Sequence, residues 1–80
     1  MKNINYLNLD NIQYDMKILA ENIKIVSLLK ILRKQKLTLE FIKKYILNEE
    51  YQLTVEETYI DKYLVLQYQP HINPEDLSEY

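Results

Sequence analysis

The 80-residue chain is long enough for one domain with one small core, since folding at this size buries only about 60% of the surface of the unfolded chain. It has neither cysteine nor glycine, which excludes disulfides, thiolate metal sites and glycine-rich phosphate loops. Its net charge of −2 differs from the strongly basic balance expected of a nucleic-acid-binding domain.

Residue usage also bears on where the protein acts. A small domain without cysteine is more typical of the cytoplasm than of a secreted protein, so we expect a cytoplasmic location. The first nine residues hold one lysine and three asparagines instead of an apolar run, and no uncharged stretch reaches membrane length, so we expect neither a signal peptide nor a membrane span. Frequent Ile, Lys, Asn and Tyr fit AT-rich codons, which favours a bacterium, phage or plasmid as the source.

The strongest pattern follows an N-terminal arm at residues 1–9. Apolar residues recur at alternating steps of four and three, which predicts an amphipathic helix. They are Ile12, Met16, Leu19, Ile23 and Val26. Asp10 offers an N-cap, so the pattern predicts one long helix over residues 10–36. A helix of about 25 residues is about 38 Å long, whereas a compact domain of this size is roughly 30 Å across.

Four apolar residues broaden the stripe in the second half of this helix until it is apolar almost all round. They are Leu28, Leu29, Ile31 and Leu32. Two short companion helices are too small to cover such a surface. We therefore expect these four residues to contact another chain, and we expect a homodimer or a tight heteromeric contact there.

Two shorter helices are predicted after the long one. Thr38 predicts the N-cap of a second helix over residues 38–50, with an apolar face of Leu39, Ile42, Tyr45 and Ile46. A capping box of Thr54 and Glu57 predicts a third helix over residues 54–69, which Pro70 ends. A short strand over residues 65–68 stays open as an alternative, because the run is β-branched and aromatic.

Residues 70–80 form an acidic tail that we expect to be exposed or ordered by a partner, with one helical turn starting at Asn73 and Pro74. The predicted fold class is therefore all-α. One long helix precedes two shorter helices in a helical-hairpin or three-helix arrangement, and an acidic C-terminal tail follows.

Charge is distributed unevenly along the chain. Residues 30–44 hold six cations against one carboxylate, whereas residues 49–80 hold eight carboxylates against one lysine. Two interpretations of the cations stay open. In one they bind phosphates or an acidic protein; in the other, the four in the last turns of the long helix stabilise its C-terminal end by about 0.3–1 kcal/mol each. The basic set is Lys30, Arg33, Lys34, Lys36, Lys43 and Lys44.

The acidic half carries a second candidate surface, because tyrosines bury a large area at low entropic cost and recur at protein interfaces. Its acidic side chains would steer it toward a basic partner. The residues we single out for partner binding are Glu56, Glu57, Asp61, Tyr68 and Tyr80. The competing interpretation is that Tyr59 and Tyr63, which are four residues apart, line the helical core.

No set of residues predicts catalysis, cofactor binding or metal ligation. His71 and Ser27 have no partners at a spacing that suits proton transfer or nucleophilic attack. The sequence favours a small protein-binding regulator or inhibitor, comparable with an antitoxin or an anti-defence protein, whose partner is basic or has an apolar groove. The alternatives are a nucleic-acid-associated factor that uses the basic set and a structural homo-oligomer.

Overall fold

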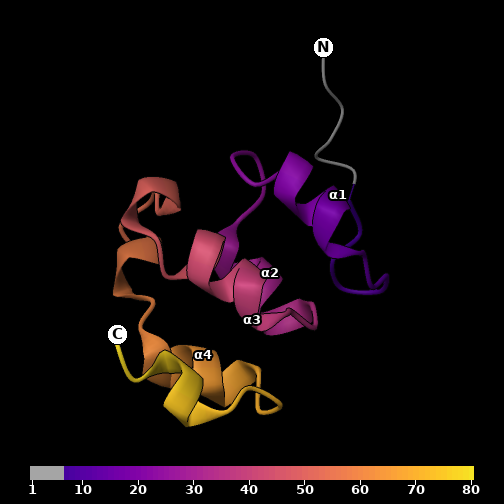
Figure 1. Cartoon of the computed structure of the whole chain (residues 1–80). Coiled ribbons are helices and arrows are strands. Elements are labelled where there is room, and N and C mark those ends of the chain that lie inside the picture. The colour runs from indigo at the N-terminus through magenta and orange to yellow at the C-terminus, as the bar shows by residue number, and fades with distance from the viewer. Residues whose placement is uncertain (1–6) are drawn as a thin grey trace.

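The computed structural model describes residues 7–80, and all regular structure in that range is helical, so the all-α class is confirmed there. Residues 1–6 of the predicted N-terminal arm lie outside the described range. The α-helices are α1 (Met16–Glu21), α2 (Leu28–Lys34), α3 (Leu39–Phe41) and α4 (Lys62–Tyr68), and shorter turns connect them (Figure 1). A π-helical turn, η2 (Ile42–Ile46), continues α3, and 3₁₀ turns form η3 (Glu49–Tyr51), η4 (Glu57–Tyr59) and η5 (Pro74–Leu77).

The prediction of one helix over residues 10–36 is wrong, because a turn divides the segment into α1 and α2. The side-chain amide of Asn22 donates to the backbone carbonyl of Ile18 at 2.8 Å, at the end of α1. Ser27 then caps α2, since its hydroxyl accepts from the backbone N–H of Lys30 at 3.3 Å. Asn and Ser side chains compete with the backbone for hydrogen bonds, so these two polar residues end one helix and start the next.

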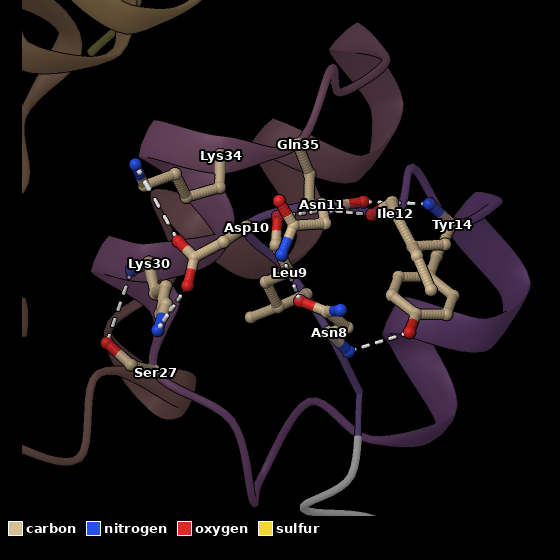
Figure 2. Close-up of polar contacts among 10 residues, drawn as sticks. All are labelled: Asn8, Leu9, Asp10, Asn11, Ile12, Tyr14, Ser27, Lys30, Lys34 and Gln35. Carbon is tan, nitrogen blue, oxygen red and sulfur yellow. Dashed lines mark hydrogen bonds and ion pairs between the residues drawn. The ribbon is translucent and has the colours of Figure 1, made fainter.

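The first helix also begins later than predicted. Asp15, not Asp10, is the N-cap of α1. The carboxylate of Asp10 lies beside α2 instead, and it contacts the ammonium groups of Lys30 and Lys34 at 3.2 and 3.6 Å (Figure 2). These ion pairs tie the segment before α1 to α2.

Gln35, directly after α2, holds the same segment from the other side. Its side-chain amide donates to the backbone carbonyls of Leu9 and Ile12 at 2.9 and 2.7 Å. Its side-chain oxygen accepts from the backbone N–H of Tyr14 at 2.8 Å (Figure 2). One buried amide thereby supplies partners to three backbone groups of a segment that lies outside any helix.

Helix α2 lies at the centre of the hydrophobic core. Leu28, Ile31 and Leu32 are almost completely buried within the single chain, and Leu29 is partly buried against the core. The expectation that these residues lie on a surface for another chain is therefore wrong for the three buried ones. Because the chain turns on both sides of α2, the flanking segments cover it, and α4 packs against it. The buried cluster is Leu9, Leu19, Ile23, Leu28, Ile31, Leu32, Leu37, Phe41, Ile42, Ile46, Ile60, Val65, Ile72 and Leu77.

The second predicted helix is confirmed in its first half. The hydroxyl of Thr38 accepts from the backbone N–H of Phe41 at 3.2 Å and caps α3. The chain then widens into η2, where the backbone N–H of Leu47 donates to the carbonyl of Ile42 at 2.9 Å. Residues 49–51 form a separate 3₁₀ turn, so the helix does not reach residue 50.

The third predicted helix is divided as well. The capping box is present, since the hydroxyl of Thr54 accepts from the backbone N–H of Glu57 at 3.2 Å, but it opens only η4. Asp61 caps α4 separately, and its carboxylate accepts from the backbone N–H of Leu64 at 2.9 Å. Aspartate is among the strongest N-caps, which accounts for a new helix start at this position. Residues 65–68 are helical, so the strand alternative is wrong.

The C-terminal segment packs on the core instead of extending from it. Ile72 and Leu77 are buried, and Asn73 caps η5 with Pro74 as its first residue, as predicted. The carboxylate of Glu79 lies 3.7 Å from the ammonium of Lys43. The expectation of an exposed tail is therefore wrong for Ile72 and Leu77, because these two apolar residues anchor it.

Asp10 gives the N-terminal segment a dependence on pH. The hydrogen bond from Lys30, with the charges of Lys30 and Lys34, lowers the pKa of Asp10 below its ordinary value of 3.8 and outweighs the opposing effect of desolvation. A lowered folded-state pKa contributes stability above the unfolded-state pKa, and this contribution is lost as the pH falls through the folded-state value. Because Asp10 is exposed, we expect the contribution to be small.

We predict that Asp10→Asn loses less stability than the unmodified protein as the pH falls from about 5 to about 2. Thermal unfolding of both proteins across this range checks the prediction. Salt at about 1 M, where the Debye length is about 3 Å, should remove most of the difference. Identical pH profiles at low salt would show that the Asp10 ion pairs contribute nothing.

Candidate protein-binding surface

The four most exposed large apolar side chains of the described chain lie within one short segment. The exposed fractions are 64% for Leu53, 69% for Val55, 75% for Tyr59 and 71% for Tyr63. Single exposed apolar residues are normal on a protein surface, whereas a concentration of them marks an interaction site. We call this segment, residues 53–63, the 53–63 surface.

The interpretation that Tyr59 and Tyr63 line the core is wrong. The backbone becomes extended at Ile60 and Asp61, between η4 and α4, which interrupts the helical spacing of the two tyrosines. Ile60 takes the inward position and is buried. The break therefore directs Ile60 into the core and leaves the rings of Tyr59 and Tyr63 exposed to solvent.

A buried carboxylate fixes the start of the 53–63 surface. Glu57 is only 5% exposed. One of its oxygens accepts from the backbone N–H groups of Leu53 and Thr54 at 2.8 and 3.3 Å. The other accepts from the backbone N–H of Leu28 at 3.0 Å, at the N-terminus of α2. That N–H has no acceptor inside its own helix, and the positive end of the helix dipole favours a carboxylate there.

These contacts change the role of Glu57. Predicted to bind a partner, it is instead an internal anchor, because its two oxygens are buried and already accept hydrogen bonds from three backbone groups. A single signal in the sequence, its capping box with Thr54, places it near the start of a helix. The contact with Leu28 joins positions far apart in the chain, so no local pattern could have shown it.

The other acidic and tyrosine residues predicted to bind a partner are exposed. Glu56 and Asp61 lie within the 53–63 surface, although Asp61 also caps α4. The ammonium of Lys62 lies 5.5 Å from the centre of the Tyr63 ring. Tyr68 and Tyr80 are exposed to a smaller extent than Tyr59 and Tyr63, and they lie outside the segment, at the end of α4 and at the C-terminus. The structure therefore does not place the four predicted side chains in one segment.

An open groove of about 480 Å³ adjoins the 53–63 surface. It lies between residues 23–33 and residues 51–57. Exposed Ile25 and Leu53 supply apolar contacts, Lys24 and Arg33 supply positive charge, and Glu56 supplies negative charge. We call it the Arg33 groove. It combines both signs of charge with apolar area.

The predicted basic set does not form one free cationic surface. Asp10 engages Lys30 and Lys34, and Glu79 engages Lys43. Arg33 lines the groove just described, while the ammonium of Lys44 lies 5.3 Å from the centre of the Tyr45 ring. Phosphate binding by this set would have to compete with carboxylates for half of it, so the arrangement adds no support to the nucleic-acid alternative. Lys36, the remaining member, is exposed two residues after the end of α2.

Among residues 7–80, no cluster of His, Cys, Asp or Glu side chains is arranged to hold a metal ion. In the same range, no helix has the length and apolar character needed to cross a membrane. The Nε2 atom of His71 lies 2.7 Å from the backbone carbonyl oxygen of Leu37, so its ring joins the C-terminal segment to the start of α3.

The architecture and this surface define a small helical domain with an anchored, exposed apolar segment. No family model, curated protein or solved structure matches the chain.

Proposed function

We propose that the protein is a non-enzymatic regulator or inhibitor that binds a protein partner through the 53–63 surface. The observation that carries the proposal is the exposure of Leu53, Val55, Tyr59 and Tyr63 at 64–75% on one short segment. Removing apolar area from water contributes about 25 cal/mol per Å², so a complementary partner would gain affinity from these side chains.

The anchoring of the segment favours the same function. Glu57 fixes its start through three backbone hydrogen bonds, and Ile60 fixes its middle in the core. A segment that is ordered before binding loses little conformational entropy when the partner arrives. The 53–63 surface is therefore suited to binding without a folding step.

The side chains also indicate the chemistry of the partner. Tyrosine rings pack against apolar groups while their hydroxyls keep hydrogen bonds. Tyr59 and Tyr63 are therefore suited to an apolar groove on the partner that has a polar edge. The exposed carboxylates of Glu56 and Asp61 favour a partner with basic residues around that groove. Association should therefore slow as the salt concentration rises.

The double variant Tyr59→Ser/Tyr63→Ser tests the proposal. A buried tyrosine at the centre of an interface contributes about 2 kcal/mol or more, so we expect affinity for the partner to fall about 100-fold or more. The partner is first isolated from native cells on the immobilised unmodified protein, and its affinity is then measured for each purified variant.

The matched control is Tyr68→Ser/Tyr80→Ser, which removes two tyrosines outside the segment. It should bind almost as tightly as the unmodified protein, and circular dichroism should show the same helical content in all three proteins. Equal affinity of both double variants would move the interface away from the 53–63 surface.

A further inference from the structure

The sequence predicts a homodimer because the apolar residues of the long helix are expected to lack cover within one chain. In the structure, the apolar residues of α2 are covered by the chain itself. A different surface carries the self-complementary chemistry that a symmetric dimer needs. In a two-fold interface the same patch of each protomer meets itself, so the patch must contain its own complement. The Arg33 groove contains both signs of charge beside exposed apolar side chains.

The charges of the groove are among those that form no ion pair within residues 7–80. Among residues 7–80, Lys30 and Lys34 of α2 are paired with Asp10, whereas Arg33 on the same helix and Lys24 have no ion-pair partner. Glu56, across the groove, is exposed and forms no ion pair within that range. A guanidinium and a carboxylate on one groove can pair twice across a two-fold axis.

The exposed apolar residues that line the same groove fit the same occupant. Ile25 and Leu53 are at least half exposed and lie at the groove, so a second copy would bury the same pair from each side. The net charge of −2 is small enough that two copies repel each other weakly. Association would also help a chain of this length, whose single core is small.

We propose that the Arg33 groove is the interface of a homodimer, in which Arg33 of each protomer pairs with Glu56 of the partner subunit and Ile25 and Leu53 pack around the two-fold axis. The dimer takes up Leu53 and Glu56 of the 53–63 surface and leaves Val55, Tyr59 and Tyr63 outside the groove. It therefore displays two copies of the outer part of the 53–63 surface, and its existence does not depend on the proposed function.

An interface centred on one groove is at the small end of the range for stable dimers, so we expect a Kd on the order of micromolar. Sedimentation equilibrium of the unmodified full chain at roughly 1 to 500 µM should show a mass that rises from 9.8 kDa toward twice that value. A mass that stays at one chain throughout would overturn the proposal.

Charge reversal tests the pairing itself. Arg33→Glu and Glu56→Arg should each raise the Kd at least tenfold, because each places like charges opposite one another twice. An equimolar mixture of the two variants should recover the dimer, since opposite charges then face each other at both positions. Lys36→Glu, which reverses an exposed charge outside the groove, is the matched control and should dimerise normally.

Three results would contradict the proposal: single reversals that dimerise like Lys36→Glu, a mixture that stays monomeric, or a control that dissociates equally. Circular dichroism of each variant separates lost pairing from lost folding. The variants Tyr59→Ser and Tyr63→Ser should keep the dimer, so failure of the dimer and failure of the proposed function are distinguishable.

Discussion

Replacing Gln69 with Leu should lower the midpoint of thermal unfolding by about 12 °C or more, which is the largest effect we expect from one exchange of similar size. The side-chain oxygen of Gln69 accepts from the backbone N–H of Leu37 at 2.9 Å. Its amide donates to the backbone carbonyls of Leu32 and Gln35, each at 2.7 Å. Leucine would leave all three backbone groups buried without a partner.

The size of the effect follows from the number of groups. Each buried polar group left unsatisfied costs about 1–3 kcal/mol, so three groups cost about 3 kcal/mol or more. A domain of this length has a free energy of unfolding of about 0.05–0.15 kcal/mol per residue, so the loss is a large part of the total. In domains of this size, 1 kcal/mol shifts the midpoint by about 4–8 °C.

Gln67→Leu is the matched control, since it makes the same exchange at an exposed position of the same helix. It should change the midpoint by no more than about 4 °C, because exposed substitutions usually change stability by no more than about 0.5 kcal/mol. Melting curves of the two variants followed by circular dichroism check the prediction. Similar curves for both would mean that the hydrogen bonds of Gln69 contribute little.

Most local signals in the sequence predicted local features correctly, although Asp10 is not the N-cap of α1. The caps at Thr38, at Thr54 with Glu57, and at Asn73 before Pro74 are all present, because each depends on residues at most three positions apart. Two of the three predicted helices nevertheless ended up divided. Periodicity shows which residues face one side of a helix, but it does not show where polar side chains such as Asn22 interrupt it.

What the sequence could not show is how α2 is held at both ends. At its N-terminus, the carboxylate of Glu57 accepts a hydrogen bond from the backbone N–H of Leu28. Near its C-terminus, the side-chain amide of Gln69 donates to the backbone carbonyl of Leu32. A helix of seven residues is too short to be stable alone, so these distant caps and the surrounding core stabilise it. Such contacts join residues about 30 or more positions apart, and no spacing rule predicts them.

The same limit applies to the candidate surface. Composition placed an acidic, tyrosine-bearing surface in the second half of the chain, and Glu56 and Asp61 are exposed there as expected. The buried state of Glu57 and the exposure of Tyr59 both depend on the break at Ile60, which the helical spacing concealed. The ion pairs that divide the basic set form only when the fold brings distant residues into contact, so the sequence did not show them.

Glu57→Gln should destabilise the protein by about 1.5–3 kcal/mol, which is the usual contribution of a hydrogen bond to a charged group. The exchange keeps the shape of the side chain but replaces one acceptor oxygen with an N–H₂ group. That group must then face either the N–H of Leu28 or the N–H groups of Leu53 and Thr54, since the carboxylate now accepts from both sides. A donor facing a donor leaves at least one buried group without a partner.

Glu75→Gln is the matched control, because it makes the same exchange on an exposed side chain outside both proposed interfaces. Chemical unfolding gives the difference in free energy, and amide hydrogen exchange shows where it arises. We expect faster exchange at Leu28 and Leu53 in Glu57→Gln, while the rest of α2 changes less.

Because the carboxylate holds the start of the 53–63 surface, the same variant should also bind the partner less tightly without any change to Tyr59 or Tyr63. Unchanged exchange at both amides would show that Glu57 does not anchor the segment, and the preordering on which the proposed function relies would then need another cause.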